Sequence, residues 1–498
     1  MNKLKLNSLS ALIFQIITLI SGLIIPQLLL TAYGTEQNGL NYSISQMLSI
    51  ISFFDFGVAA VAQATLYKPL HKRDIATVSG IYNSINRYFN KLSLGLLIYI
   101  LFLCIYYGTE KSSQYSWVYT TTLVLAISIS LIGQYALGIS NQVLLSADQK
   151  MYIYMFINTI ATLINIISTY ILVSFGYSIQ LVRLISSIIF LIRPIFLQYY
   201  VKKHYCLLSI SEVGYRTIPN QWSGLIQHIA VTLTSSLDSI ILTLLSTFSN
   251  VSIYSIYAFP LNGVRLLIES IGSGYKSHFG AIFVREEDSE IPLIESFSKF
   301  EWFINFVSVV LFCIMTNVLT PFVIVYTKEV EDANYSQPVF GFILIVAFLL
   351  MNLRIPYTTV INAAGHFRET QSHSLIEIVI NIALSVILVG EFGLVGVAIG
   401  TAISIFYRII VSIIYLRKFV LKFSLINRLR ILIVDTCTII IFLLFSSLLS
   451  FEINTYFSIF IYSIVCGLLA TLLYILISGL FYRKMIMNVR TIFNRRKS

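Results

Sequence analysis

The ten residues INIISTYILV, at positions 164–173, return as INIALSVILV at positions 380–389, with six of the ten residues identical. The two stretches align without a gap and place Asn165 opposite Asn381. A short turn precedes the helix that contains each of them, SAD in the first copy and AAG in the second. Chance similarity between isoleucine-rich segments is the competing explanation. The shared turns favour a duplication, in which the chain consists of two related halves.

The chain around both stretches is far more apolar than a water-soluble protein. Hydrophobic residues make up 57% of the 498 positions and charged residues only 11%, whereas soluble domains carry about a quarter charged residues. A larger soluble core does not explain the excess, because single cores stop growing near about 250–300 residues. We therefore expect an all-α integral membrane protein with lipid as the solvent for most of the chain.

Apolar runs of about 20 residues, long enough to cross a bilayer as a helix, recur along the sequence. They lack the alternating pattern of barrel strands. The first run is too long for a signal peptide and no small-residue cleavage site follows it, so we expect it to be retained. We predict about fourteen transmembrane helices, at 9–31, 44–66, 86–107, 116–138, 152–174, 179–200, 222–247, 252–275, 299–325, 339–359, 373–390, 393–416, 429–450 and 456–481.

Lysines and arginines are distributed unevenly between the connections. If the N-terminus is cytoplasmic and the spans alternate, Lys111 and Lys328 are the only positive residues in the outer loops. Positive residues favour cytoplasmic loops, so we predict that both termini are cytoplasmic. The net charge of +11 then reflects membrane topology. Nucleic acid is not expected as a partner, because the basic residues do not cluster on a soluble face.

The two copies of the repeat are separated by six predicted crossings and therefore have the same orientation in the membrane. Such repeats are related by an axis along the membrane normal, as in parallel-repeat transporters. We predict two pseudo-symmetric six-helix lobes, at 9–200 and 222–416, with a cleft that opens alternately to each side. Two further helices follow at 429–481, and a basic cytoplasmic tail at 482–498.

Three segments carry a family resemblance: FFDFGVAAVAQATLYKPLHKRD (53–74), LDSIILTLLSTFSNVSIYSIYAFPLN (237–262) and INAAGHFRETQSHSLIEIVINIALSVILVGEFGLVGVAIGTAIS (361–404). They resemble the Wzx-type polysaccharide or O-antigen repeat-unit flippases of the multidrug/oligosaccharidyl-lipid/polysaccharide (MOP) exporter superfamily. The resemblance implies a V-shaped exporter that moves an undecaprenyl-diphosphate-linked oligosaccharide across the bacterial inner membrane. The last two helices resemble those that flank a lipid-tail groove in lipid-linked precursor flippases.

The resemblance also implies which molecules the protein works with. They are the lipid-linked oligosaccharide, membrane lipids, and as protein partners a polysaccharide polymerase and a chain-length regulator. We expect no cofactor and no metal, and energy from an H⁺ or Na⁺ gradient, from the membrane potential or from substrate supply. The sequence contains no nucleotide-binding loop, metal-ligand spacing or nucleophile triad, so we do not expect an enzyme. A cation-coupled multidrug exporter of the same superfamily (MATE-like) is the alternative.

Charged residues inside predicted spans indicate a site, because each costs roughly 2.5–3.5 kcal/mol to insert and usually faces water or a partner. Arg265 lies in the eighth span, roughly 20 Å from its outer end at about 1.5 Å per residue. Glu269 follows one turn later on the same face. Guanidinium binds phosphate bidentately, so we predict that Arg265 faces the cleft and contacts a diphosphate or acidic sugar. A self-neutralising pair with Glu269 is the alternative.

Two more arginines, Arg183 and Arg354, are predicted to extend this cationic cavity surface, one in each lobe. Arg183 lies near a membrane interface and could instead snorkel to the headgroups. Arg354 precedes Pro356, a predicted helix break, and a structural role is its alternative. Four further charged residues lie nearer the ends of their spans: Arg193, Arg408, Glu377 and Asp435.

Buried acidic residues are candidates for ion coupling, because a desolvated carboxylate binds a proton more readily. Asp55 in the second span and Asp238 in the seventh are the main candidates. Hydrogen bonding between helices is the alternative role for each. Glu269 is a third candidate if it does not simply pair with Arg265, and His228 is a weaker one for proton relay. Asn165 and Asn381 are expected to form hydrogen bonds between helices.

Overall fold

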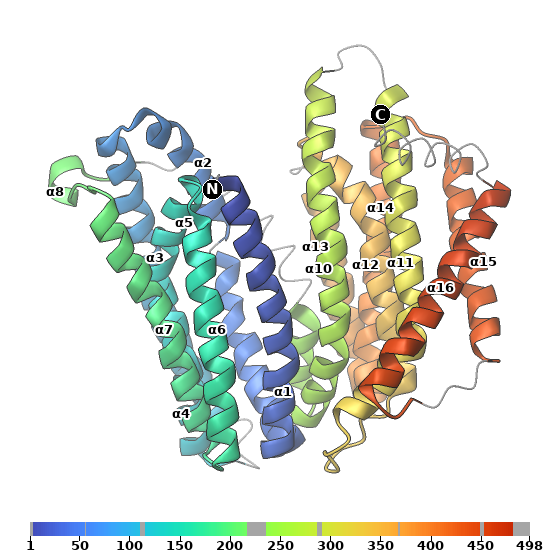
Figure 1. Ribbon diagram of the computed structural model, residues 1–498, viewed down its shortest axis with the longest axis horizontal. Helices are drawn as coiled ribbons and strands as arrows, with labels where there is room; N and C mark the ends of the chain where they lie inside the picture. Colours follow the sequence, from blue (N-terminus) through green and yellow to red (C-terminus); the bar gives the residue numbers. More distant parts are fainter. Residues whose placement is uncertain are drawn as a thin grey trace. The chain divides into compact units, whose positions relative to one another are not determined.

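The computed structural model describes residues 3–54, 56–109, 115–216, 236–285, 291–366, 369–448 and 453–481. Within these ranges the chain is helical and contains no strand (Figure 1). Twelve of the described helices are long and apolar enough to cross a membrane. The predicted all-α membrane fold is confirmed, and the predicted count of about fourteen spans is approximately right.

Two predicted spans are not among the twelve. The span predicted at 44–66 is formed by the end of α1 (Lys3–Ser49), the 3-10 helix η1 (Ile50–Phe54) and part of α2 (Phe56–Lys72). Gly34 separates it from the first span inside α1, with a φ of 82° that glycine adopts readily. Of the span predicted at 222–247, residues 236–247 are described, and Ser236–Leu245 form a helix.

The chain divides into two compact units, which we call unit 1 (Met1–Ser236) and unit 2 (Leu237–Ser498). The predicted start of the second lobe, at 222, lies outside the described residues, so that boundary stays a prediction. In unit 1, α6 packs between α1 and α7, while α4 packs against α3 and α7. After α2, the elements of unit 1 are α3 (Ile75–Thr109), α4 (Trp117–Gly133), η2 (Gln134–Gly138), α5 (Ile139–Ala147), α6 (Met151–Ser174), α7 (Ile179–His204) and α8 (Ile210–Val213).

Unit 2 is built around α12, which packs against α10, α11 and α14. Helix α13 packs on α14, and the last two helices pack on α11 and on each other (Figure 1). After Ser236–Leu245, its elements are α10 (Phe248–Arg285), α11 (Ile291–Tyr326), α12 (Pro338–Ala363), α13 (Gln371–Phe392), α14 (Leu394–Phe419), α15 (Leu425–Ser446) and α16 (Tyr456–Phe481).

Two buried polar clusters hold the C-terminal helices on α11. In the first, Arg428 at the start of α15 forms an ion pair with Glu301 of α11, and Tyr357 of α12 donates a hydrogen bond to the same carboxylate. Glu301 is fully buried, so its charge is compensated within the protein and not by water. This pairing fixes the entry of α15 against α11 and α12.

The second cluster lies one turn further along α11. Asn305 Nδ2 donates to Asp435 Oδ2 of α15 at 2.8 Å, and the hydroxyl of Tyr474 on α16 donates to Asp435 Oδ1 at 2.9 Å. Asp435 is 4% exposed. One carboxylate therefore joins three helices, which makes α15 and α16 an integral part of unit 2.

The internal repeat is visible as a shared contact in the two units. In unit 1 the hydroxyl of Ser186 on α7 donates to Asn165 Oδ1 on α6. In unit 2, Asn381 Nδ2 on α13 donates to Thr401 Oγ1 on α14 at 3.0 Å. Ser186 and Thr401 are each the eighth residue of their helix. The predicted hydrogen bonding of both asparagines between helices is confirmed, and the duplication explains why the two bonds correspond.

The α13–α14 contact leads to a stability prediction. A Cβ placed on Gly396 would overlap the backbone carbonyl of Leu388. A backbone carbonyl cannot move aside as the end of a flexible side chain can. We expect Gly396→Ala to lower the free energy of unfolding by about 1–3 kcal/mol through overpacking. Gly390→Ala is the matched control, because a Cβ there meets no atom within 4 Å. Thermal denaturation of the purified protein measures both, and equal stability of the two variants would contradict the packing argument.

Candidate functional site

A polar stripe follows one face of α10 through the membrane region. Its members recur at spacings of three and four residues, which places them on one side of a helix. All are partly or fully exposed within unit 2. A side of a spanning helix that faces only lipid carries apolar residues, so this face is suited to water or a polar partner. The members of the stripe are Asn262, Arg265, Glu269, Ser273 and Lys276.

Arg265 is the cation at the centre of this stripe. Its Nε lies 3.4 Å from Glu269 Oε1, and its Nη1 donates to the Sδ of Met351 on α12 at 3.6 Å. The first contact lacks hydrogen-bond geometry, so the buried Nε–H has no acceptor among the described residues. A thioether is a weak acceptor. The predicted pairing with Glu269 is present, yet within the described chain it leaves the Nε donor of Arg265 without an acceptor and Nη1 with only a weak one.

Arg354 lies on α12 three residues beyond Met351, close to the α10–α12 contact. The helices approach closely nearby, since a Cβ on Gly272 of α10 would lie 2.8 Å from Ile355. The structure thus gathers three predicted site residues, Arg265, Glu269 and Arg354, on two adjacent helices of unit 2.

Arg354 belongs to a three-residue charge cluster that joins α12, α13 and α14. Its Nη1 lies 2.8 Å from Glu377 Oε1, and Arg408 Nε lies 3.7 Å from Glu377 Oε2. The side chain of Glu377 is 3% exposed, while that of Arg354 is 24% exposed. Two guanidinium groups share one carboxylate, so the cluster carries excess positive charge, and Arg354 is its more accessible end.

Unit 1 contains arginines with weaker compensation. Arg193 and Arg408 are each the fifteenth residue of their helix, α7 and α14. Arg408 has a carboxylate partner, whereas Arg193 donates to the neutral side chain of Asn158 and to its own helix at Phe190 O. Arg183 is partly buried, and its Nε has no hydrogen-bond acceptor among the described residues. The structure places Arg183 in unit 1, on a helix other than those that carry Arg265 and Arg354.

Asp238 is buried in a hydrogen-bonded network of unit 2. Thr401 Oγ1 donates to its Oδ1 at 2.5 Å, and the hydroxyl of Tyr254 donates to its Oδ2 at 3.0 Å. Asn381 in turn donates to Thr401. This geometry fits the predicted role as a hydrogen-bond partner between helices, and the coupling role stays a prediction. Two other candidates, Asp55 and His228, lie outside the described residues.

The network around Asp238 predicts a difference between two substitutions. Asp238→Ala leaves the hydroxyls of Thr401 and Tyr254 without their acceptor, and we expect a loss of about 1–3 kcal/mol in unfolding free energy. Asp238→Asn keeps an acceptor oxygen and should lose less. Thermal unfolding in detergent compares the two, and an alanine variant at least as stable as the asparagine variant would contradict the assignment.

The sequence prediction missed the buried pair of Glu301 and Arg428. Glu301 lies at the start of the span predicted at 299–325 and Arg428 immediately before the span predicted at 429–450, and neither is among the predicted site residues. One signal was present, since Glu301 is flanked by Phe300 and Trp302 in a strongly apolar stretch. Its partner, Arg428, lies 127 positions later in the sequence, and the pair becomes apparent only when α15 packs on α11.

Unit 2 also has an apolar groove of about 310 Å³ between α12, α14 and α15. Its walls include Leu353, Phe406 and Leu432, and Arg428 and Asp435 lie in its lining. The groove therefore combines a hydrocarbon surface with charged groups from the two polar clusters that hold α15.

No protein-family model and no curated protein match the chain. Solved membrane transporters do match its structure. The lipid II flippase MurJ in an inward closed conformation has a TM-score of 0.68 and 15% sequence identity, and the match covers 97% of this chain and 99% of that one.

Two MATE transporters show the same fold over a smaller part of the chain. An inward-facing MATE family transporter of the MOP superfamily has a TM-score of 0.56 and 12% identity, with 85% of this chain and 94% of that one covered. A Vibrio cholerae MATE transporter has a TM-score of 0.54 and 13% identity, with 83% and 95% covered. At these identities the similarity shows the fold, which this chain shares with MOP transporters.

Proposed function

We propose that the protein is a flippase that translocates undecaprenyl-diphosphate-linked oligosaccharide repeat units across the bacterial inner membrane by alternating access. The cargo would serve the assembly of a surface polysaccharide such as O-antigen or capsule. The shared fold supports membrane transport as the general activity. The match to the lipid II flippase supports a lipid-linked cargo. The 3% of this chain left unmatched is shorter than either α15 or α16, so the match extends into both of these helices.

The observation that carries the proposal is the incompletely satisfied Arg265 on the polar face of α10. A diphosphate presents several anionic oxygens, and charge-assisted hydrogen bonds to guanidinium are stronger than neutral ones. Arg354 lies nearby on α12, in a cluster with excess positive charge. We propose that Arg265 and Arg354 contact the diphosphate or acidic sugars, and that Arg183 contributes from unit 1.

The groove beside α15 supports a lipid-linked cargo from a separate direction. Its apolar walls suit a hydrocarbon chain, since burying each methylene group is worth about 0.8 kcal/mol. We propose that the prenyl tail of the cargo lies in this groove while the diphosphate and sugars follow the polar route.

The location and partners follow from the same proposal. Both termini lie in the cytoplasm, as the distribution of basic residues predicts, and the protein resides in the inner membrane. A polysaccharide polymerase and a chain-length regulator act next on the translocated units. An H⁺ or Na⁺ gradient supplies the energy, with Asp55, Asp238 and Glu269 as candidates for coupling or charge pairing.

A cation-coupled multidrug exporter is the second candidate, and the MATE family matches are the observation that favours it. The excess positive charge around Arg354 disfavours cationic drugs. Deletion of the gene separates the two functions. We expect loss of surface glycan, accumulation of lipid-linked repeat units and unchanged drug sensitivity, all restored by the wild-type gene. Normal glycan display with raised drug sensitivity would overturn the proposal in favour of the exporter.

A further inference from the structure

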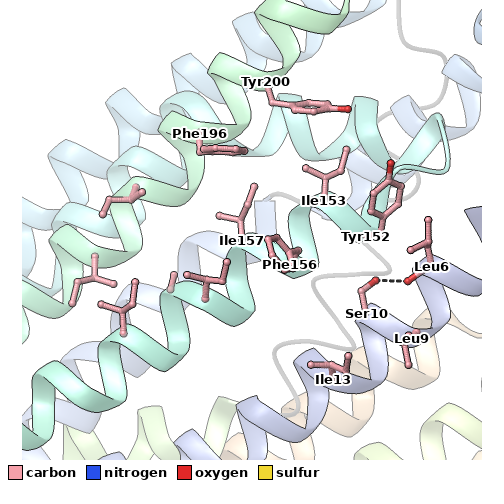
Figure 2. Close-up of a pocket in the computed structure, with 15 residues that line it drawn as sticks. Leu6, Leu9, Ser10, Ile13, Tyr152, Ile153, Phe156, Ile157, Phe196 and Tyr200 are labelled. Atoms are coloured by element: carbon pink, nitrogen blue, oxygen red, sulfur yellow. Dashed lines mark hydrogen bonds between the residues drawn. The ribbon is translucent and has the colours of Figure 1, made fainter.

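Unit 1 contains a second apolar groove, of about 560 Å³, which the transport proposal does not use. It lies between α1, α6 and α7. Figure 2 shows α6 with Phe156 in the middle, α7 with Phe196 on one side and α1 with Ile13 on the other. Large apolar side chains remain uncovered there: Phe156 is 63% exposed and Ile192 is 55% exposed. The groove is therefore open along its length and lined by side chains that favour hydrocarbon.

The lining offers almost nothing to a polar ligand. The hydroxyl of Ser10 donates to Leu6 O of its own helix at 2.6 Å (Figure 2), so this donor is already satisfied within α1. The remaining residues of the lining are aliphatic or aromatic, apart from the hydroxyl groups of Tyr152 and Tyr200. A sugar or a charged drug would lose its hydration here without replacement. A hydrocarbon chain is the chemistry that fits.

One end of the groove is fixed and marks a membrane interface. Tyr152 lies at the start of α6 and Tyr200 in the last turns of α7, and tyrosines are enriched at headgroup depth. Asn7 of α1 accepts a hydrogen bond from Tyr152 N at 2.8 Å and donates to Gln149 O at 3.0 Å. These bonds tie the start of α1 to the start of α6, so this end of the groove is preformed.

Positive charge lies just beyond that end. Lys202 and Lys203 occupy the last turn of α7, two and three residues beyond Tyr200, and both are exposed. Neither has a carboxylate partner among the described residues, and Lys203 lies over the ring of Tyr199 at 5.9 Å. Lys150 is different, because it pairs with Asp148 at 2.7 Å. The two α7 lysines are thus available to an anion at headgroup depth.

We propose that this groove binds one anionic glycerophospholipid, with an acyl chain along α6 between α1 and α7 and its phosphate at Lys202 and Lys203. Apolar lining, tyrosines and unpaired lysines follow one another along the groove in the order of chain, interface and headgroup. A zwitterionic lipid fills the same walls but gains less at the lysines. The site is independent of the cargo and would hold its lipid while transport proceeds elsewhere.

A tryptophan reporter tests the site in nanodiscs. Phe156→Trp is made in a chain whose native Trp117, Trp222 and Trp302 are replaced by phenylalanine, and quenching by acyl-brominated phosphatidylglycerol is compared with brominated phosphatidylcholine. We expect half-quenching by phosphatidylglycerol at a roughly ten-fold lower mole fraction. Leu94→Trp on α3 is the matched reporter, since Leu94 is 62% exposed and lies outside the groove. It should show no preference.

The lysines are tested in the same reporter. Lys202→Gln with Lys203→Gln should abolish the preference, while Arg417→Gln with Lys418→Gln, at the corresponding positions of α14, should preserve it. Equal quenching by the two lipids at Phe156→Trp, or a preference that survives loss of both α7 lysines, would overturn the proposal. Displacement of the brominated lipid by undecaprenyl phosphate at lower mole fraction than by unlabelled phosphatidylglycerol would also overturn it, in favour of a prenyl occupant.

Discussion

Replacing Arg265 by alanine is expected to reduce export of surface glycan at least ten-fold while the protein remains folded in the membrane. Among the described residues, the Nε donor of the guanidinium has no acceptor and its Nη1 has only a thioether, and a hydrogen bond to a charged group contributes about 1.5–3 kcal/mol. Loss of that contribution in the transport cycle corresponds to a factor of about 10 or more. Surface glycan measured per unit of membrane-inserted protein gives the result.

Two variants control this prediction. Arg265→Lys keeps a positive charge but removes the planar fork of donors, so we expect an intermediate rate. Lys299→Ala breaks the Lys299–Glu295 pair, which has the same i,i+4 spacing as Arg265 and Glu269. That pair is exposed, and its loss should leave export unchanged. Full export by Arg265→Ala at normal protein levels would exclude a contact between Arg265 and the cargo.

Replacing Glu377 by glutamine is expected to give the largest loss of stability. Glu377 is the shared carboxylate of Arg354 and Arg408, and its side chain is 3% exposed. Its neutralisation leaves two guanidinium groups without an anion, and breaking buried ion pairs in this way costs about 3–5 kcal/mol. Thermal unfolding of the purified protein should show a clear decrease in midpoint.

A matched control and a rescue make this prediction specific. Glu391→Gln changes the other glutamate of α13, which is exposed at the end of the helix, and should have little effect. Adding Arg408→Leu to Glu377→Gln removes one unpaired charge, so the double variant should lose less than the sum of the single losses. Unchanged stability of Glu377→Gln, or strict additivity in the double variant, would contradict the cluster.

The sequence was sufficient to predict those features that depend on local pattern. Long apolar runs identify spanning helices because the bilayer fixes their length, and the repeat identified Asn165 and Asn381 as related positions. The prediction of the span at 44–66 did not include its interruption by η1, because hydropathy averages over a window and does not register a break in helical geometry. Composition reports where the chain is apolar and not where the helix is continuous.

The candidate site could be predicted only where its contacts are local. The Arg265–Glu269 pair follows from i,i+4 spacing on one helix, and the structure contains it. The second partner of Arg265, Met351, and the partner of Arg354, Glu377, come from other helices. Those contacts depend on how α10, α12 and α13 pack, which side-chain spacing along one segment does not encode. Charge content therefore identified the residues but not their partners.

Reconstitution with lipid-linked cargo tests the central claim most directly. Proteoliposomes are loaded symmetrically with an undecaprenyl-diphosphate-linked oligosaccharide, and a membrane-impermeant glycosidase removes the outer sugars. We predict that the wild-type protein makes the inner pool accessible over time, that Arg265→Ala does so at least ten-fold more slowly, and that Lys299→Ala matches the wild type. An inner pool that stays protected with folded wild-type protein would contradict the assignment of this chain as a flippase of lipid-linked oligosaccharides.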